Sequence, residues 1–489
     1  MKSVSTVQGR APRQNASRAL WILAVAVILG VALALFVVFG SSHVDRTVIG
    51  AAGLALFLVL LFLGMPIGAA MGIAGSIGLF GVGSLNSVRR TLIDIPYSSV
   101  ASWSLSVIPM FIFMGLLLWR SGATSRMFDA ARTWLNWLPG GQAVTVNAAG
   151  AGLAAASGST LGIAYALGRI GIPEMLKSGY NRKLALAAVL LAGLPGQLIP
   201  PSLLLVVYAG VTNLPVGPQL LAGIVPGLAL VSIVILTIVG LCILNPKLAP
   251  RTTEHVAWTD RWRSLAQVWP VPILVLVVIG GMYSGLFTAT EAAAVGAILA
   301  FCITMFFCRG RDRISAVSSS IANTVNSVGS LFFMIIGSSL LNRFLALSGI
   351  PKAFTDFVQS ADLGPIGFLL AAIAVMFLLG LFMESIAMLL ISVPIFLPSL
   401  NHFEIDQMWF GIVAVLVAET AVLTPPVGIL VYLVHSLTQE KEVSGDVEIT
   451  LGDVFGAAIL ALPLIAAVIT LLFIFPEIAT WLPNASSSR

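Results

Sequence analysis

Two long apolar segments of this chain are each broken in the middle by small polar or acidic residues. The first, 144–176, contains Ser157-Gly158-Ser159-Thr160, and the second, 368–400, contains Glu384-Ser385. A proline pair follows each break, at Pro200-Pro201 and Pro425-Pro426. Inside a membrane, backbone groups freed by such a break are tolerated only where they line a cavity or pack against protein. The pattern predicts two broken helical elements within a helical membrane protein.

The spacing of the two segments indicates an internal duplication. Pro200 and Pro425 lie 225 residues apart (425 − 200 = 225), and the same offset places Ser159 opposite Glu384 (384 − 159 = 225). Chance alignment of common prolines is the alternative, but further offsets agree. Interrupted segments at matching positions of two halves are typical of a transporter binding site. We therefore expect an all-α polytopic transporter with two repeats, each holding a re-entrant hairpin and a broken helix.

Composition supports a membrane protein. The chain of 489 residues is 58% hydrophobic and 9% charged, whereas about a quarter of the residues of soluble domains are charged. Three cysteines in or beside apolar runs argue against a disulfide framework. The net charge of +5 fits basic loops on one side of a membrane better than nucleic-acid binding. Without a Gly-x-x-x-x-Gly-Lys-Ser/Thr motif or a catalytic constellation, an ATP-driven pump and an intramembrane enzyme are disfavoured.

Hydropathy and charge divide the chain into eight expected parts. These are a cytoplasmic tail (1–18), an extra transmembrane helix and link (19–47), scaffold helices (48–138), the first transport repeat (139–215), scaffold helices with central cytoplasmic loops (216–315), the second-repeat scaffold (316–364), the second transport repeat (365–438), and a terminal helix and tail (439–489).

The positions of basic residues predict the orientation. Basic residues flank the first broken segment, whereas 401–406 has no lysine or arginine. The first hairpin should therefore open to the cytoplasm and the second to the outside, which inverts the repeats. The N-terminus would be cytoplasmic and the C-terminus periplasmic, in a bacterial inner membrane. Two features oppose this assignment: Arg343 and Lys352 fall outside, and the acidic loop 439–453 falls inside.

Three local patterns predict smaller elements. Residues 84–103 form a more polar link between apolar segments. The interleaved tryptophans and arginines of 245–269 fit either a short helix on the membrane interface or an unstructured basic loop. Thr288 precedes Glu291 by three residues at the start of an apolar run, which predicts a capping box and a structural role for this acid.

Seven motifs follow one another along the chain: Pro139-Gly140-Gly141, Ser157-Gly158-Ser159-Thr160, Ile172-Pro173-Glu174-Met175, Ile199-Pro200-Pro201-Ser202, Ala222-Gly223-Ile224-Val225-Pro226-Gly227, Gly285-Leu286-Phe287-Thr288-Ala289-Thr290-Glu291 and Leu423-Thr424-Pro425-Pro426-Val427-Gly428. Together they resemble the large membrane subunit of tripartite ATP-independent periplasmic (TRAP) transporters. The resemblance implies uptake of an organic anion driven by sodium (Na+), with the two hairpins moving as an elevator. It also implies two partners, a small membrane subunit and a periplasmic binding protein that delivers the substrate. A stand-alone dicarboxylate/sodium symporter of related fold is the alternative.

The sequence departs from the family pattern at three places. Met383 is followed by Glu384 where the family usually has aspartate, and 193–197 reads Gly-Leu-Pro-Gly-Gln where the family usually has Gly-Thr-Leu-Gly. The extra helix of 19–40 resembles the helix that links fused small and large subunits. The first two departures bear on ion coordination and substrate choice.

Sodium prefers hard oxygen ligands, which hydroxyl groups and the carbonyls freed by broken helices supply. The candidate cation and substrate site comprises Ser157, Gly158, Ser159, Thr160, Pro200, Pro201, Ser202, Glu384, Ser385, Thr424, Pro425 and Pro426. Sodium would bind through Ser157, Ser159, Thr160, Glu384 and Thr424. In the resemblance, the residues matching Ser157, Ser202 and Glu384 belong to the transport site. The structural alternative is that each hydroxyl bonds the preceding turn of its own helix.

Three charged residues in apolar sequence have open roles. Glu384 would ligate a cation, carry a proton or partner a helix N-terminus. Glu419 fits an ion relay or a hydrogen-bonded brace equally. Arg169 would either meet a substrate carboxylate or anchor the cytoplasmic side.

Overall fold

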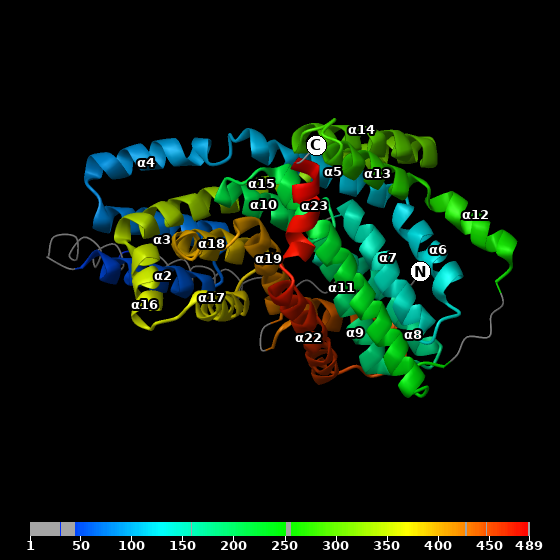
Figure 1. Cartoon of the computed structure of the whole chain (residues 1–489). Helices are drawn as coiled ribbons and strands as arrows, with labels where there is room; N and C mark the ends of the chain where they lie inside the picture. Colours follow the sequence, from blue (N-terminus) through cyan, green and yellow to red (C-terminus); the bar gives the residue numbers. More distant parts are fainter. Residues whose placement is uncertain are drawn as a thin grey trace, which may run out of the picture. The chain divides into compact units, whose positions relative to one another are not determined.

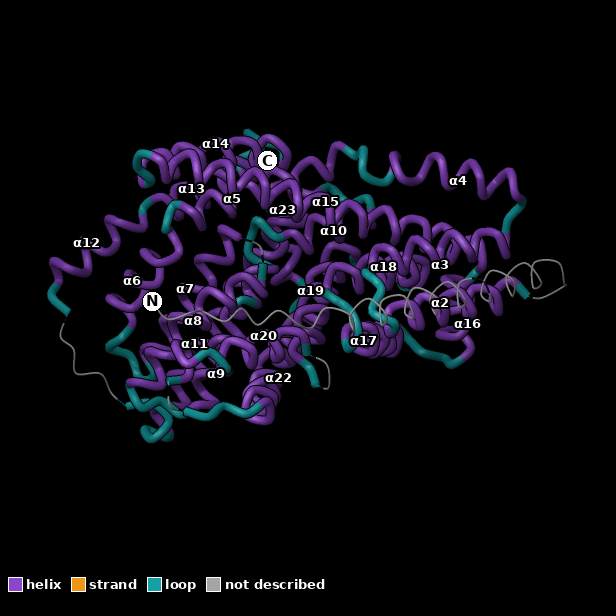
Figure 2. The backbone as a smooth tube through the Cα atoms, turned by 180° about the vertical axis from the view of Figure 1, so that it is seen from behind, coloured by secondary structure: helices purple, strands orange, loops and turns teal. Residues whose placement is uncertain are grey.

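The computed structural model describes residue 30 and residues 45–157, 159–250, 256–425, 428–445 and 447–487, except for the side chains of residues 124, 154–157 and 487. Every regular element in these ranges is a helix (Figure 2). In this part of the chain, six helices are long and apolar enough to cross a membrane, or seven if the bent pair Trp258–Val268 and Pro270–Tyr283 is one span. The expectation of an all-α polytopic membrane protein is confirmed. The helix expected over 19–40 lies outside the described residues, apart from residue 30.

The chain forms two compact units. The first comprises the described parts of Met1–Ser99 and Phe333–Phe354, and the second those of Val100–Phe332 and Thr355–Arg489. The first unit holds α2 (Arg46–Phe62), α3 (Ile67–Val82), α4 (Leu85–Ser98) and the end of α15 (Arg311–Ser348). Every candidate site residue belongs to the second unit. The eight-part division expected from sequence stays a prediction.

Close helix packing holds the first unit together. A Cβ atom added to Gly68 of α3 would lie 3.0 Å from the Cα atom of Met334 in α15, and one on Gly75 would lie 2.7 Å from the Cα atom of Leu341. Small residues at a helix interface let backbones approach closely, which is how helices associate in membranes. The unit also contains α4, whose start Ser84 caps by accepting from the Ser87 N–H at 3.4 Å. Most of the expected polar link is therefore helical.

The first repeat consists of a hairpin and a broken helix, drawn in cyan to green in Figure 1. The hairpin is α7 (Gly141–Ser157) and α8 (Thr160–Lys177). The broken helix runs as α9 (Arg182–Ala192), the 3-10 turn η2 (Leu194–Gln197) and α10 (Leu203–Thr212). Proline removes a backbone donor, so Pro195, Pro200 and Pro201 account for the interruption between α9 and α10.

The second repeat has the same order of elements, in yellow to orange in Figure 1. Its helices are α17 (Pro365–Gly380), α18 (Ser385–His402), α19 (Gln407–Leu423) and α20 (Ile429–Thr438). Successive starts follow those of α7, α8, α9 and α10 by 224 (365 − 141), 225 (385 − 160), 225 (407 − 182) and 226 (429 − 203) residues. All four breaks fall where the sequence predicts them.

The second half of each broken helix packs against the hairpin of the other repeat. The second half of the first broken helix, α10, packs against α18 of the other hairpin, and α20 of the second repeat packs against α8 of the first. Each hairpin therefore rests on a helix from the other repeat. This exchange brings the two breaks toward one place.

Further helices surround the repeats in the second unit. They are α5 (Val107–Arg120), α6 (Ala123–Leu135), α11 (Val216–Leu244), α12 (Trp258–Val268), α13 (Pro270–Tyr283), α14 (Ala289–Phe307), α21 (Lys441–Ser444), α22 (Leu451–Ile474) and α23 (Glu477–Ser487), with the 3-10 turn η1 (Trp103–Ser106). The first part of α15 and the last part of α16 (Ile350–Ser360) also belong to this unit, and their remaining residues belong to the first unit. The helical alternative for 245–269 holds for α12, which Trp134 of α6 joins by an Nε1–H bond to the Arg261 carbonyl at 3.1 Å. The capping box of Thr288 and Glu291 is confirmed at the start of α14.

Candidate functional site

A single buried carboxyl group joins the two hairpins. Glu419 lies in α19 and is 6% exposed. Its Oε2 accepts a hydrogen bond from the Thr160 hydroxyl at 2.6 Å, and its Oε1 accepts one from the Ser385 hydroxyl at 2.9 Å. Thr160 is the first residue of α8 and Ser385 the first residue of α18. The starts of the two hairpins' second helices therefore meet at one side chain.

The backbone around Glu419 repeats the symmetry of the chain. The Thr160 hydroxyl lies 3.4 Å from the carbonyl oxygen of Gly193, and the Ser385 hydroxyl lies 3.4 Å from that of Ala418. Both pairs are related by 225 residues (385 − 160 and 418 − 193). Each hydroxyl thus faces the same point on the broken helix of its own repeat. We call these groups, with Glu419, the carboxyl hub: Thr160, Gly193, Ser385, Ala418 and Glu419.

Close packing fixes the first half of the carboxyl hub. A Cβ atom on Gly193 would lie 2.7 Å from the carbonyl oxygen of Thr160 and 2.9 Å from its methyl group. A side chain at residue 193 would push α8 away from the broken helix. Glycine at this position is therefore needed for the Thr160 hydroxyl to reach Glu419.

Two predicted serines cap the helices that start at the first-repeat breaks. The Ser159 hydroxyl accepts from the Gly162 N–H at 3.2 Å at the start of α8, and that of Ser202 accepts from the Leu205 N–H at 3.2 Å at the start of α10. Ser202 also donates to the Gln197 carbonyl. The peptide bond between Pro200 and Pro201 is cis, directly before Ser202. These residues shape the break without touching Glu419.

The second break differs in chemistry. Glu384 is the residue before α18, and its side chain makes no capping bond. It is partly buried and interacts electrostatically with Glu419. In the part of the chain that the structure describes, neither acid forms an ion pair. The second break therefore presents a carboxyl group where the first presents the hydroxyl of Ser159.

The remaining predicted residues divide into two groups. The Thr424 hydroxyl donates to the Thr420 carbonyl at 2.7 Å, so it bonds its own helix. Pro425 ends the described part of this break. The Ser157 side chain, Gly158 and Pro426 lie outside the described residues. Of the predicted site, the structure brings Thr160, Ser385 and Glu384 together around Glu419.

A cavity of about 470 Å³ opens beside the tip of the first hairpin. Ser159 and Gly162 line it from that hairpin, Trp119 from α5 and Ser327 from α15. Aliphatic side chains make most of the remaining wall, and none of the lining residues is charged. The cavity is large enough to hold a small molecule beside the first hairpin.

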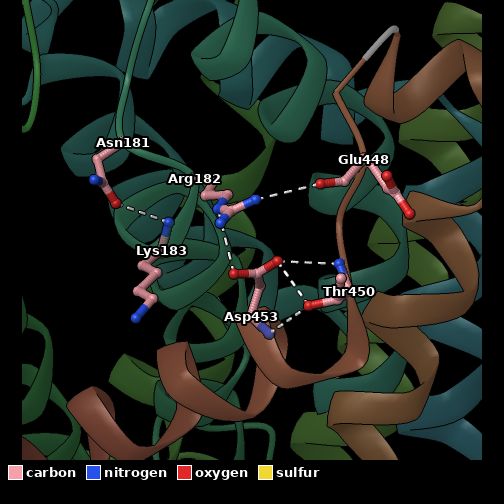
Figure 3. A network of polar contacts seen from close by, with 6 residues as sticks. All are labelled: Asn181, Arg182, Lys183, Glu448, Thr450 and Asp453. Carbon is pink, nitrogen blue, oxygen red and sulfur yellow. Dashed lines mark hydrogen bonds and ion pairs between the residues drawn. The ribbon is translucent and has the colours of Figure 1, made fainter.

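Arg169 lies away from this tip. Its guanidinium pairs with Glu440, the N-cap of α21, at 2.6 Å and lies 3.8 Å from Glu442 in the first turn of that helix. A second ion pair joins the start of α9 to the start of α22, where Arg182 Nε lies 3.2 Å from Asp453 (Figure 3). Arg182 also donates to the Glu448 carbonyl at 3.4 Å. These contacts favour the anchoring role for Arg169 over substrate binding.

Sequence reasoning gave no role to two groups of the carboxyl hub. Gly193 and Ala418 act through backbone carbonyls, which no residue type reveals. The 225-residue offset was the available signal, because it pairs them as it pairs Thr160 with Ser385. The hydrogen bonds of Glu419 to both hairpins fit the brace that the sequence predicts as one of its two roles.

The hub supplies six oxygen atoms from five residues: two carboxyl, two hydroxyl and two carbonyl. Such oxygen-rich sites at broken helices suit small cations and protons. A buried carboxyl also costs free energy unless hydrogen bonds or a bound cation offset it. The hub is therefore an oxygen-rich point at which the broken elements of both repeats meet.

Known protein sequences are similar to this chain over most of its length. The family model "Tripartite ATP-independent periplasmic transporter, DctM component" matches residues 54–478. The chain is 31% identical to the C4-dicarboxylate TRAP transporter large permease protein DctM of Vibrio cholerae, over 88% of this chain and 96% of that protein. It is 28% identical to the sialic acid TRAP transporter large permease protein SiaM of the same organism, over 88% and 97%.

A solved structure has a similar fold. The YdaH transporter of Alcanivorax borkumensis superposes with a TM-score of 0.57 at 15% identity, over 88% of this chain and 98% of that one. Its similarity concerns the fold alone. The family model covers most of the chain, and the relatives are transporter permeases rather than enzymes. The chain belongs to the DctM family of TRAP transporter large membrane subunits.

Proposed function

We propose that this subunit takes up an organic acid across a bacterial inner membrane, driven by a sodium gradient. A periplasmic binding protein delivers the acid, and a small membrane subunit packs alongside. The observation that carries the proposal is the carboxyl hub, where Glu419 joins Thr160 of one hairpin to Ser385 of the other. Broken helices from two repeats meet there, which is the arrangement of ion and substrate sites in secondary transporters.

The cavity beside Ser159 is the proposed substrate position. It lies next to the start of α8, where free backbone N–H groups and the helix dipole favour a carboxylate. Sodium would bind oxygen atoms at the two breaks, including the hydroxyls of Ser157 and Ser159 and the carboxyl of Glu384. The names of two relatives support an organic acid as the substrate, since one is a C4-dicarboxylate permease and the other a sialic acid permease.

Ion pairs support the proposed inverted orientation. Arg169 and Arg182 flank the opening of the first hairpin and pair with Glu440 and Asp453 of the acidic loop. The acidic loop 439–453 lies on the cytoplasmic side in this orientation, which its negative charge alone does not favour. Its acids are nevertheless the ion-pair partners of the two arginines proposed to lie on that side. At the far end of the first broken helix, the Tyr208 hydroxyl donates to the Gln407 carbonyl at 2.6 Å. The start of α19, which follows the second hairpin, thus adjoins the opposite end of the same broken helix.

An elevator movement fits the exchange of helices between repeats. Because α10 packs on α18 and α20 packs on α8, the hairpins and broken helices form one interlocked body. A body held together in this way is suited to move as a unit against surrounding helices. The N-terminus would be cytoplasmic and the C-terminus periplasmic.

Reconstitution into liposomes tests the proposal. The two membrane subunits should accumulate radiolabelled succinate or N-acetylneuraminate only with an inward sodium gradient and a cognate binding protein outside. Glu384→Gln should lower sodium-driven uptake by at least about tenfold if this acid ligates the ion. Uptake without any binding protein would instead favour a stand-alone sodium symporter. Parental uptake by Glu384→Gln would remove this acid from the ion site.

A further inference from the structure

Helix α12 carries an exposed apolar stripe. Its residues recur at the spacing of one helix face and continue into the bend before α13, at Trp258, Trp262, Leu265 and Trp269. Each of these side chains is between 41% and 65% exposed. The opposite face of α12 is polar, with Thr259, Asp260, Arg263 and Gln267. The described residues therefore leave about half of this stripe open to its surroundings.

An aromatic cluster fixes α12 against α6, its neighbour in Figure 1. The ring of Trp134 in α6 lies edge-on to the rings of Trp258 and Trp262, with centroids 6.4 and 5.8 Å apart. Its Nε1–H also donates to the Arg261 carbonyl at 3.1 Å. Aromatic pairs of this geometry are stabilising. The stripe is therefore part of the folded surface and does not belong to a detached helix.

The stripe adjoins the end of a candidate membrane span. Trp269 stands at the 49° bend between α12 and α13, and its ring lies 6.5 Å from those of Phe306 and Phe307. These two residues end α14, which is long and apolar enough to cross a membrane. Aromatic rings at the ends of spans lie where the hydrocarbon meets the headgroups. From this level, a helix bent away from the span is suited to lie along the membrane surface.

Two arginines flank the stripe. In a helix of about 3.6 residues per turn, Arg261 lies on one side of the stripe and Arg263 on the other. The guanidinium carbon of Arg261 lies 4.9 Å from the centre of the Trp258 ring, and its Nε is buried without a hydrogen-bond partner. Among the described residues, neither arginine forms an ion pair. Since α12 holds one acid, Asp260, against these two bases, the stripe lies in a positively charged setting.

We propose that α12 binds anionic phospholipid at the membrane surface. Its aromatic stripe enters the interface, and Arg261 and Arg263 hold the phosphate group of the lipid. A guanidinium matches the oxygens of a phosphate, and stacking on an indole ring leaves its N–H groups free to donate. An amphipathic helix with tryptophan on one face and basic residues beside it binds such lipids. The inference adds a lipid site to the subunit and does not depend on substrate uptake.

The end of α14 adds positive charge to the same place. This helix ends beside Trp269, and it is followed by the exposed arginines Arg309, Arg311 and Arg313, with one acid, Asp312. In the proposed orientation these arginines face the cytoplasmic leaflet, whose anionic lipids attract basic segments. Both segments next to the stripe therefore favour the same kind of lipid.

A lipid fits the stripe better than a second protein does. Helices that associate in membranes do so through small residues, whereas three tryptophans and a leucine make this stripe. The 11 residues of α12 are also too few to cross the hydrocarbon, which takes roughly 20. Tryptophan is instead enriched at the headgroup level. The competing occupants are the small membrane subunit and a second copy of this chain.

Quenching by brominated phospholipid tests where the stripe lies. The subunit is placed in phosphatidylcholine vesicles, and Trp258→Phe with Trp262→Phe identifies the emission of these two rings by difference. That emission should be quenched by phosphatidylcholine brominated near the headgroup, and less by lipid brominated near the chain end. If the double variant does not fold, Trp262→Phe alone provides the difference. Quenching by aqueous acrylamide without quenching by brominated lipid would place the stripe in water and overturn the inference.

The choice of lipid is measured in the same vesicles. A small fraction of brominated phosphatidylglycerol should quench the emission at least about twofold more than the same fraction of brominated phosphatidylcholine, because basic residues near the surface attract anionic lipid. Arg261→Gln with Arg263→Gln should remove this excess and keep the quenching by phosphatidylcholine. No excess in the parental protein contradicts the inference.

A matched control separates the site from the net charge. Arg89→Gln with Arg90→Gln makes the same charge change in α4, where both arginines are exposed, and should keep the excess. Equal loss in both double variants would show that the lipid follows the net charge, and the assignment to α12 would be wrong. Thermal unfolding at the parental temperature confirms that each variant is folded.

The competing occupants give a different signal. Adding the small membrane subunit, or raising the amount of protein per lipid, should leave the quenching of Trp258 and Trp262 by brominated lipid unchanged. Protection of these rings by either change would make the stripe a protein interface and overturn the inference.

Discussion

The two repeats share a backbone plan but differ in the side chains at equivalent points. Ser159 precedes α8 and caps it, whereas its counterpart Glu384 precedes α18 without a capping bond. The residue equivalent to Glu419 is Leu194 (419 − 225 = 194). Both repeats therefore supply a hydroxyl to the hub, whereas Glu384 and Glu419 both come from the second repeat. Duplication explains the shared backbone plan, and the chemistry of the two breaks differs where the side chains differ.

The same comparison explains why one acid serves two hairpins. Thr160 and Ser385 are equivalent, yet a single carboxyl accepts from both. A second acid at residue 194 would place like charges around the same hydroxyls, which is unfavourable in a buried site. One carboxyl group without a counterpart in the first repeat therefore contacts both hairpins.

Removing the asymmetric acid should have the largest effect. Glu419→Leu places the first-repeat residue in the second repeat and removes the nearer acceptor of two buried hydroxyls. Each lost partner costs about 1–3 kcal/mol, so unfolding should occur at lower temperature. Sodium-driven uptake should fall by more than about tenfold. The control Leu194→Met keeps an apolar residue and should transport normally; parental uptake by Glu419→Leu would show that the hub is not needed.

Exchanging the residues that supply the backbone carbonyls should have the next largest effect. Gly193→Ala copies the second-repeat residue and brings a Cβ atom within 2.7 Å of the Thr160 carbonyl oxygen. The clash should destabilise the protein by about 1–3 kcal/mol, measured by thermal unfolding. The reverse exchange, Ala418→Gly, should cost only about 0.5–1 kcal/mol. Equal costs for the two changes would mean that the close approach in the first repeat is not real.

Capping should matter in one repeat and not in the other. Ser159→Ala removes a bond to the Gly162 N–H and should cost about 0.5–2 kcal/mol of stability, which Ser159→Asp should restore. Glu384→Ala removes no capping bond, so its effect on stability should be smaller than that of Ser159→Ala. Thermal unfolding of the three variants decides, and an opposite order would reverse the roles given to these residues.

The smallest effect is expected at Arg169. Its pair with Glu440 is about 40% exposed on both sides, and such pairs contribute about 0.2–1 kcal/mol. Arg169→Gln should therefore change uptake by about twofold or less, and high salt should weaken the parental pair similarly. Arg169→Lys is the control that keeps the charge. A loss as large as that of Glu419→Leu would return Arg169 to the substrate site.

Sequence predicted the breaks because their causes are local. Proline and small polar residues interrupt apolar segments by their own chemistry, and the helices α8 and α18 begin within the predicted breaks, at Thr160 and Ser385. The helix α4 within the expected polar link was missed, because its apolar residues are sparse and its pattern is amphipathic. Composition alone separates polar from apolar stretches but does not distinguish a surface helix from a loop.

The partners of the site residues could not be predicted in the same way. Thr160 and Glu419 are 259 residues apart, and Arg169 and Glu440 are 271 apart. The repeat offset pairs equivalent residues but does not tell which side chain lies between them. Thr424 illustrates the limit, because its hydroxyl was expected to bind sodium and donates to its own helix. Such choices depend on tertiary packing.

Cross-linking tests most directly whether the second helices of the two hairpins begin close together. Thr160→Cys with Ser385→Cys, in a chain whose Cys242, Cys302 and Cys308 are replaced, should be joined by a short thiol-bridging reagent in native membranes. A protease site placed at 309–313 would then separate the halves only in uncross-linked protein. Thr160→Cys with Ser399→Cys is the control, since residue 399 lies about 21 Å further along α18. Efficient joining of the first pair alone supports the account, and joining of neither pair, or of both equally, contradicts it.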